Sequence, residues 1–261
     1  MSETTAYIHP DAKIAPGVVI EPFAVIQKNV EIGEGTWIGS HAVISEGARI
    51  GKNCKIYSGA QISSVPQDLK FQGEETTAEI GDNTTIREFA TISRGTSDRM
   101  TTKVGANCLI MAYCHVAHDC VVGDHCIMSN ASQLAGHVVL DDHVVIGGMT
   151  GVHQFVHIGA HVMLAGLVVA RKDVPPFIMA GREPLSFTGV NSIGLRRRGF
   201  SNEQINLIQD IYRIVYHKGL NTTRAIDIIE KEIPDGQEKE TVIEFLKGSG
   251  RGIIRGVGDN V

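Results

Sequence analysis

The sequence contains no run of 18 apolar residues, which a helix needs in order to cross a membrane. Its first residues, MSETTAYIHP, lack the charged and then apolar pattern of a secretion signal. We therefore expect a cytoplasmic protein without stable membrane insertion. The formal net charge is -5 and the pI is near 6.1. Bulk positive charge for holding a nucleic acid is missing, so we expect no such partner.

Paired cysteines are also missing. None of the five cysteines stands in a C-x-x-C pair, the spacing typical of zinc and redox sites. They share one place in a six-residue repeat, and elsewhere that place holds Ala, Thr, Ser or Val. We therefore interpret them as small buried side chains, with no metal or disulfide. These cysteines are Cys54, Cys108, Cys114, Cys120 and Cys126.

The six-residue repeat runs through most of the chain. An aliphatic residue or Met stands at every sixth position from Ile8 to Leu164, except at Asp68, Glu74 and Asp98. This period predicts a parallel β-helix, in which each hexad forms one short strand and one turn, and three hexads complete a triangular coil. Residues that are 18 apart then stack one above the other, with strands about 4.8 Å apart.

The three exceptions mark two interruptions of the repeat, near residues 64–79 and 97–103. We interpret them as loops that leave the coil, because binding residues often collect on the loops of a rigid scaffold. The alternative is that they are merely tolerated insertions.

A different pattern begins after the repeat ends near the two prolines, Pro175 and Pro176. Ser201 and Gln204 have the spacing of a helix cap, and apolar residues follow at helical intervals. We expect further helices over residues 222–233 and 237–247. The predicted fold is therefore mainly β, with a β-helix domain over residues 1–185 and a C-terminal α-helical domain over residues 186–261.

The stacking rule brings polar residues from separate turns to one corner of the coil. Gly136 lies 18 positions after His118, and His137 lies 18 positions after Asp119. A further step of 18 leads from Gly136 to Gln154. The corner is therefore expected to carry His118, Asp119, Gly136, His137, His153 and Gln154.

This corner suits acyl transfer without a covalent intermediate. A histidine titrates near neutral pH, so His118 can take a proton from a substrate hydroxyl. Asp119 is the candidate partner that orients it, and the backbone N–H of Gly136 can meet a developing oxyanion. The sequence offers no serine or cysteine nucleophile with a comparable neighbourhood.

Several longer motifs resemble those of the UDP-N-acetylglucosamine O-acyltransferases, over nearly the whole chain. They are P-Q-D-L-K-F-Q-G-E (Pro66–Glu74), H-V-A-H-D-C (His115–Cys120), A-G-H-V (Ala135–Val138), I-G-G-M-T-G-V-H-Q-F (Ile146–Phe155), D-V-P-P (Asp173–Pro176) and G-V-N-x-x-G-L-x-R-R-G-F (Gly189–Phe200). The resemblance implies a left-handed β-helix homotrimer. It would move a 3-hydroxyacyl group from acyl carrier protein to the 3-hydroxyl of UDP-N-acetylglucosamine, the first step of lipid A synthesis. No cofactor is implied, since the donor is carried on the phosphopantetheine of acyl carrier protein.

The resemblance also implies residue roles. His118 would be the general base, Asp119 its supporting carboxylate and Gly136 the oxyanion donor. Ile193 stands where the family often has Glu, which would remove a ribose contact, and Gly166 stands where the family measures acyl-chain length. A glycine would not block the acyl chain there. We therefore expect the donor to carry a long 3-hydroxyacyl chain, of about 14 carbons or more. The implied substrate-binding residues are Gln67, Asp68, Lys70, His115, His137, His153 and Gln154, with Asn191, Arg197 and Arg198 reaching the nucleotide of a neighbouring subunit.

Charge near these arginines agrees with the resemblance. Residues 171–198 contain six basic and two acidic side chains, a net charge of +4 in a chain that is acidic as a whole. Such a patch suits a diphosphate or an acidic carrier protein. An ordinary solvated face is the alternative.

Two other activities compete with this interpretation. An N-acyltransferase of the same pathway, acting on an amino sugar, shares the H-x-x-H-D spacing, although the Q-D-L-K loop and the C-terminal motif favour the O-acyltransferases. The second competing activity is that of a metal-dependent β-helix hydrolyase. His125, His143 and His161 are spaced by 18, so they stack and could provide metal ligands. The place expected for the third ligand of such a site holds Gly166, so a packing ladder is the default interpretation.

Overall fold

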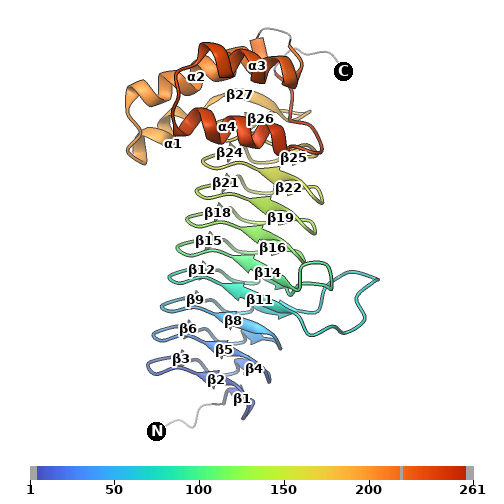
Figure 1. The fold of residues 1–261 in the computed structure, drawn as a ribbon. Helices are drawn as coiled ribbons and strands as arrows, with labels where there is room; N and C mark the ends of the chain where they lie inside the picture. Colours follow the sequence, from blue (N-terminus) through green and yellow to red (C-terminus); the bar gives the residue numbers. More distant parts are fainter. Residues whose placement is uncertain (1–4, 218–219, 257–261) are drawn as a thin grey trace.

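The computed structural model describes residues 5–217 and 220–256. Its β part is a three-sided prism of stacked coils, and the helices cover the end of the prism that is formed last along the chain (Figure 1). Three parallel sheets form the three sides, and each coil contributes one strand to each sheet. Among the strands of the described residues, only the last, β27, runs antiparallel to its neighbour.

The first sheet contains, in spatial order, β1 (Tyr7–Ile8), β4 (Val25–Ile26), β7 (Val43–Ile44), β10 (Gln61–Ser64), β13 (Thr91–Ser93), β16 (His115–Val116), β19 (Gln133–Leu134), β22 (Gly151–Val152) and β25 (Val169–Ala170). The second contains β2 (Lys13–Ile14), β5 (Glu31–Ile32), β8 (Ala48–Ile50), β11 (Thr77–Ile80), β14 (Thr101–Val104), β17 (Val121–Val122), β20 (Val139–Leu140) and β23 (His157–Ile158). The third contains β3 (Val19–Ile20), β6 (Trp37–Ile38), β9 (Lys55–Ile56), β12 (Thr85–Ile86), β15 (Leu109–Ile110), β18 (Ile127–Met128), β21 (Val145–Ile146), β24 (Met163–Leu164), β26 (Ile178–Gly181) and β27 (Ser186–Val190).

Strand register confirms the 18-residue stacking. Val116 pairs with Leu134, and Leu134 pairs with Val152. Two steps are longer, because Ile62 pairs with Ile92 and Ile92 pairs with Val116, which are 30 and 24 residues apart. The chain therefore makes two excursions that add 12 and 6 residues to their coils.

Both excursions leave the prism at the corner between the first and second sheets, over residues 65–76 and 94–100, and project from the same edge (Figure 1). Both end about three residues earlier than the sequence suggested. Residues 77–79 and 101–103 belong to β11 and β14, which pair along Thr77–Ile80 and Thr101–Val104. The second excursion also begins earlier, directly after Ser93.

The core is a column of aliphatic side chains along the axis of the prism. In the middle coils, the aliphatic residues that recur at every sixth position are fully buried, for example Ile44, Ile62 and Ile92. The five cysteines are buried, as the sequence indicated for their small inward place. Each of them is a free thiol. The Cys120 thiol donates to the Ala135 carbonyl at 3.1 Å, and burial raises its pKa to about 12.

Many turns contain a residue with the left-handed backbone conformation. Asp119 and His137 have φ values of 59° and 62°, and His125, His143 and His161 are similar. Asp and His tolerate this conformation better than branched residues do. In the column of His125, His143 and His161, the chain therefore repeats one side chain at the same turn of three successive coils.

The helices are α1 (Ser192–Arg197), α2 (Asn202–His217), α3 (Thr222–Glu232) and α4 (Gln237–Gly248). Ser201 and Gln204 form the predicted cap: the Ser201 N–H donates to Gln204 Oε1 at 2.9 Å, and the Gln204 N–H donates to Ser201 Oγ at 3.2 Å. Tyr212 ties α2 to the prism, since its hydroxyl donates to the Pro176 carbonyl at 2.6 Å. Within the described residues, no helix is long and apolar enough to span a membrane.

The division expected between residues 185 and 186 falls inside a β-hairpin. β26 and β27 pair in antiparallel fashion from Ile178 to Val190, so β27 extends the third sheet. The first helix begins only at Ser192.

Candidate active site

A pocket of about 760 Å³ lies at the corner where the two excursions leave the prism. Turns of three successive coils form its floor, and the excursions form its walls. It is lined by Gln67, Asp68, Leu69, Lys70, Glu74, Thr96, Ser97, Asp98, His118, Gly136, His137, Gln154 and Phe155.

His118 lines this pocket and forms a hydrogen-bonded dyad with Asp119, which is buried behind it. His118 Nδ1 lies 2.8 Å from Asp119 Oδ2. In a strand, neighbouring side chains point to opposite faces, but Asp119 adopts the left-handed conformation, so the two side chains meet. Asp119 is completely buried and His118 is 8% exposed. The pair is therefore rigid and largely shielded from water.

The second excursion holds the Asp119 carboxylate in place. The Thr96 N–H donates to Oδ1 at 3.0 Å, and the Thr96 hydroxyl donates to Oδ2 at 2.7 Å. The Arg99 N–H is 3.3 Å from Oδ1. Burial by itself would raise the pKa of Asp119, but the hydrogen bonds from Thr96 and His118 outweigh it and keep this pKa below its usual value. The carboxylate is therefore ionised at neutral pH.

Gly136 lies on the next coil, in contact distance of the His118 ring. A Cβ atom at residue 136 would stand 2.7 Å from both Nε2 and Cε1 of His118. Such a contact is far too short. Any side chain at residue 136 would therefore displace the His118 ring, and glycine avoids this. The Gly136 N–H has no hydrogen-bond partner among the described residues, whereas those of Ala135 and His137 do. It remains available to a ligand oxygen beside the imidazole.

His137 completes the polar cluster. Its ring stacks on Phe155 at 4.5 Å and meets His118 edge-on at 5.2 Å. Its Nδ1 lies 3.2 Å from Asp98 Oδ2, and its Nε2 lies 3.7 Å from Asp119 Oδ2. Burial lowers the pKa of His137 by more than these carboxylates raise it.

The donor atoms of His118, Asp119 and His137 lie within 4.8 Å of one another, close enough for a metal ion to be held. Both Asp119 oxygens already accept hydrogen bonds, and His118 uses Nδ1 for one of them. We therefore interpret the cluster as a proton-transfer site.

The structure brings most of the predicted site residues together. Besides the dyad, Gly136 and His137, the pocket contains Gln67, Asp68, Lys70 and Gln154. Sequence reasoning missed Thr96, Asp98 and Phe155. Thr96 and Asp98 lie in an excursion, where the repeat loses its phase and stacking arithmetic cannot locate a residue.

Two other predicted residues lie beside the pocket. His115, on β16, shares a hydrogen bond of 2.7 Å with the Thr91 hydroxyl. Burial, and then the charge of His118, lower the pKa of His115. His153 is exposed, and its Nδ1 lies 3.4 Å from a guanidinium nitrogen of Arg251.

The remaining predicted residues lie at other corners of the prism. Asn191 and Arg198 contact the turns between the second and third sheets, through the carbonyls of His161 and His143. Arg197 is exposed. Gly166 is exposed at the corner between the third and first sheets, where a Cβ would lie 3.1 Å from the Gly148 carbonyl oxygen. Within one chain these residues are not part of the His118 pocket.

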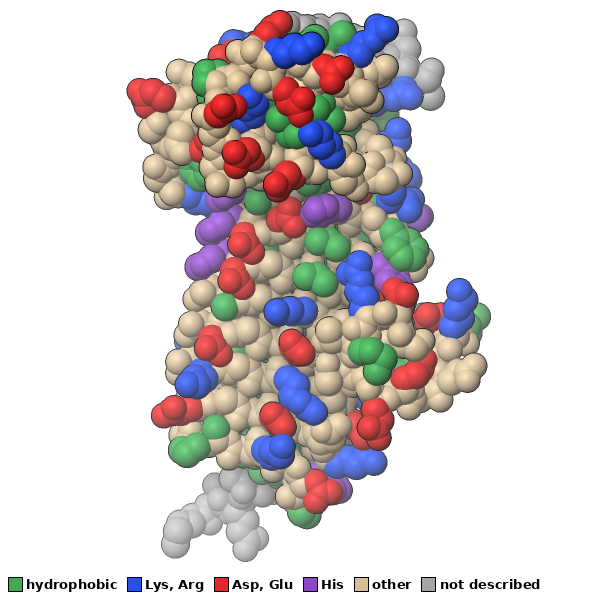
Figure 2. Space-filling model, in the orientation of Figure 1, with side chains coloured by type: hydrophobic (Ala, Val, Ile, Leu, Met, Phe, Trp, Pro, Cys, Tyr) green, Lys and Arg blue, Asp and Glu red, His purple; other side chains and the backbone are tan. Residues whose placement is uncertain are grey.

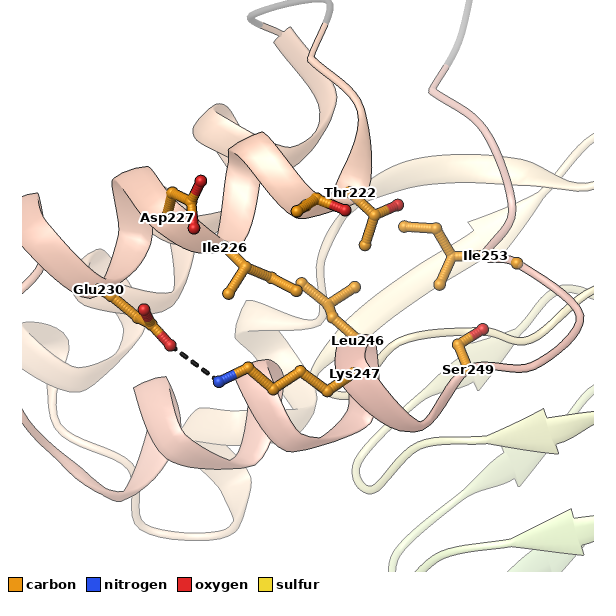
Figure 3. Close-up of a pocket in the computed structure, with 10 residues that line it drawn as sticks. Thr222, Ile226, Asp227, Glu230, Leu246, Lys247, Ser249 and Ile253 are labelled. Carbon is orange, nitrogen blue, oxygen red and sulfur yellow. Dashed lines mark hydrogen bonds and ion pairs between the residues drawn. The ribbon is translucent and has the colours of Figure 1, made fainter.

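A second pocket, of about 440 Å³, lies in the helical domain between α3, α4 and residues 249–253 (Figure 3). Its lysine, Lys247, is paired with Glu230 at 2.8 Å. The pocket has no histidine and no buried ionisable cluster, so its lining does not provide a proton acceptor comparable to His118.

His125, His143 and His161 form a stack of nearly parallel rings. Successive ring centres are 4.7 Å apart, with interplanar angles of 6° and 12°. Among the described residues, the only three potential metal ligands that converge are His118, Asp119 and His137. The stacked histidines therefore match a packing ladder better than the ligand set of a hydrolyase.

A coil of hexads with a buried carboxylate–histidine dyad and a free backbone N–H defines a hexapeptide-repeat acyltransferase. Sequence families agree with this class. A family described as bacterial transferase hexapeptide (six repeats) matches residues 29–64 and 101–136, and one described as UDP N-acetylglucosamine O-acyltransferase, domain 2, matches residues 173–254.

Full-length relatives are more specific. A protein of Thermodesulfovibrio yellowstonii is 44% identical over 252 residues, covering 96% of this chain and 98% of the relative. A protein of Trichlorobacter lovleyi is 49% identical over 256 residues, covering 97% and 98%. Both are named acyl-[acyl-carrier-protein]–UDP-N-acetylglucosamine O-acyltransferase. The crystal structure of the UDP-N-acetylglucosamine acyltransferase of Bacteroides fragilis superimposes with a TM-score of 0.96 at 49% identity, covering 98% of this chain and 100% of that one.

The chain belongs to the UDP-N-acetylglucosamine O-acyltransferase family. The predicted left-handed parallel β-helix with a C-terminal helical region is thereby confirmed. The two competing activities, on an amino sugar or through a metal, are not favoured.

Proposed function

We propose that this acyltransferase moves a 3-hydroxyacyl group from acyl carrier protein to the 3-hydroxyl of UDP-N-acetylglucosamine, the step that starts lipid A synthesis. The observation that carries the proposal is the buried His118–Asp119 dyad beside the free N–H of Gly136. The names of the full-length relatives support the substrate pair.

The dyad geometry supports direct transfer. An ionised carboxylate only accepts hydrogen bonds, so His118 must carry its proton on Nδ1, which leaves the Nε2 lone pair free. Nε2 takes the proton of the sugar hydroxyl as the oxygen attacks the thioester carbonyl. Asp119 stabilises the imidazolium that forms, as in other carboxylate–histidine pairs. The Gly136 N–H stabilises the oxyanion. The intermediate then expels the phosphopantetheine thiolate, which recovers the proton from His118.

The first excursion supplies the polar wall for the sugar nucleotide. Asp68 Oδ1 accepts a hydrogen bond from the Lys70 N–H at 3.0 Å, which shapes a tight turn. Gln67, Asp68 and Lys70 line the pocket together. An amide, a carboxylate and an ammonium suit sugar hydroxyls and a diphosphate. No cofactor is needed, since the donor arrives on the phosphopantetheine of acyl carrier protein.

We also infer a closed homotrimer with three-fold symmetry. Asn191 and Arg198 lie at a different corner from His118 in the same chain. A three-fold arrangement would let this corner complete the pocket of a neighbouring subunit. Gly166 would lie along the acyl chain at the remaining corner, where a glycine offers the chain no stop. We infer that the enzyme acts in the cytoplasm, where acyl carrier protein and sugar nucleotides are found.

A transfer assay tests the proposal. Labelled 3-hydroxyacyl donor on acyl carrier protein would be offered with UDP-N-acetylglucosamine, with its 3-amino analogue, or with the already 3-O-acylated sugar nucleotide. Product with the first acceptor alone is the expected result. Preference for the amino analogue, or no transfer to either, would contradict the assignment.

A further inference from the structure

The histidine ladder, defined as the stacked rings of His125, His143 and His161, has no part in the proposed chemistry. It follows one edge of the prism at the corner between the second and third sheets, and histidine side chains gather on the coils beneath the helical domain (Figure 2). The stack continues onto Phe177, whose ring centre is 5.6 Å from that of His161. Phe200 meets His161 edge-on at 5.1 Å. The upper end of the ladder is therefore enclosed by aromatic rings.

Both ends of α1 are attached to this ladder. Asn191, which caps α1, donates through Nδ2 to the His161 carbonyl at 2.9 Å. Arg198, directly after α1, donates through Nη2 to the His143 carbonyl at 3.1 Å. Residues 191–200, here called the arginine segment, thus hydrogen-bond to the backbone of two successive ladder turns, and the His161 ring itself contacts Phe200 at the end of the segment. These partners are 30 and 55 residues apart in the chain, so the contacts are tertiary.

We propose that His143 and His161 are positioning residues for nucleotide binding, because they seat the arginine segment. The inference rests on the proposed function, in which the corner that carries Asn191 and Arg198 completes the pocket of a neighbouring subunit. α1 has only six residues, too few to be stable by itself. Its placement therefore depends on the surface under it.

The charge state of the ladder histidines affects how the arginine segment packs against them. His143 is faced by Arg198 and His125, and by the carboxylates of Asp142 and Asp124. Burial, followed by the charge of Arg198, lowers the pKa of His143 despite the two carboxylates. His161 is faced by His143 and Arg198, and burial lowers its pKa to about 4.

Neutral rungs can lie beside the Arg198 guanidinium, whereas protonated rungs would repel it. Folding lowers the pKa of such a histidine below its unfolded value of about 6.5. Above about pH 6.5 the histidine is neutral in both states, and its full contribution to the stability of the folded arrangement is present. That contribution is lost as the pH falls toward the folded pKa, which for His161 is about 4. The seat should therefore loosen between these two values.

The test compares three variants of the full-length protein. His161→Ala removes a rung, His161→Phe keeps a flat ring that cannot take a proton, and His41→Ala is the matched control. His41 stacks on Phe23 at 5.1 Å from the same kind of left-handed turn, but in the first coils, away from the arginine segment. Each variant would be assayed for the Kd of UDP-N-acetylglucosamine, for kcat at saturating acceptor, and for amide hydrogen exchange over residues 191–200.

We expect His161→Ala to weaken nucleotide binding by about threefold to tenfold, as for the loss of one aromatic contact, with kcat nearly unchanged. Exchange over residues 191–200 should become faster. His161→Phe should bind normally at pH 7.5 and lose less affinity than the unmodified protein at pH 5. His41→Ala should match the unmodified protein in all three measurements.

Two results would overturn the inference. Unchanged exchange over residues 191–200 in His161→Ala would show that the His161 ring does not hold the arginine segment in place. Faster exchange with unchanged nucleotide affinity would show that the seat does not serve binding. Failure of the proposed function would look different, because the unmodified protein would then bind no UDP-N-acetylglucosamine, while the exchange comparison would still report on the seat.

Discussion

Gly136→Ala is the smallest change that tests the proposed catalytic geometry. It adds one carbon at a position where the backbone conformation of glycine is not required, since residue 136 is not among those with positive φ. The new Cβ would stand 2.7 Å from His118 Nε2 and Cε1, whereas ordinary contacts begin near 3.4 Å. The imidazole must therefore move by roughly 0.7 Å or more.

This movement is costly because the ring is held from the other side. His118 Nδ1 is bonded to Asp119, and Thr96 in turn holds Asp119. A displacement of about 1 Å in a catalytic group costs on the order of 10²-fold in rate. We expect kcat to fall by about that factor, and by more if the methyl group also blocks the oxyanion at the residue 136 N–H. Nucleotide affinity should change little, since the sugar and diphosphate contacts lie elsewhere in the pocket.

The assay is steady-state acyl transfer, with the Kd of UDP-N-acetylglucosamine measured separately. Gly151→Ala is the matched control, because a Cβ at residue 151 meets nothing within 4 Å. Thermal unfolding of both variants would show whether the coil is intact. If Gly136→Ala keeps kcat within twofold of the unmodified protein while it stays folded, His118 does not act from this position.

Thr96→Val removes the hydroxyl that donates to Asp119 at 2.7 Å, a charge-assisted bond that contributes about 1.5–3 kcal/mol. Because this bond helps to lower the pKa of Asp119, the acidic limb of the kcat/KM profile should shift to higher pH; an unshifted limb would argue against the role of the excursion. Mixed trimers of inactive His118→Ala and inactive Arg198→Ala chains should regain part of the activity, and a monomer by light scattering would rule out shared sites. Gly166→Met should penalise long acyl donors by about 1–3 kcal/mol through overpacking and spare short ones, and an unchanged chain-length profile would place the limit elsewhere.

The sequence alone determined the columns of the prism. A β-helix repeats its backbone every 18 residues, so a residue number is also a place on the surface. That is why His118 and Gly136, and likewise Asp119 and His137, could be paired from their residue numbers. The Ser201–Gln204 cap was predictable for a similar reason, since it depends only on residues three apart.

Only the tertiary structure decided what approaches these columns from outside the repeat. Thr96 reaches Asp119 from an excursion whose path no period describes. The His118–Asp119 contact itself depends on one left-handed residue, which spacing does not reveal. Arg198 meets His143 across 55 residues, through the packing of the helical domain on the end of the prism. Periodic backbone geometry is local and repeats itself, whereas these contacts depend on how separate segments fold back on the coil.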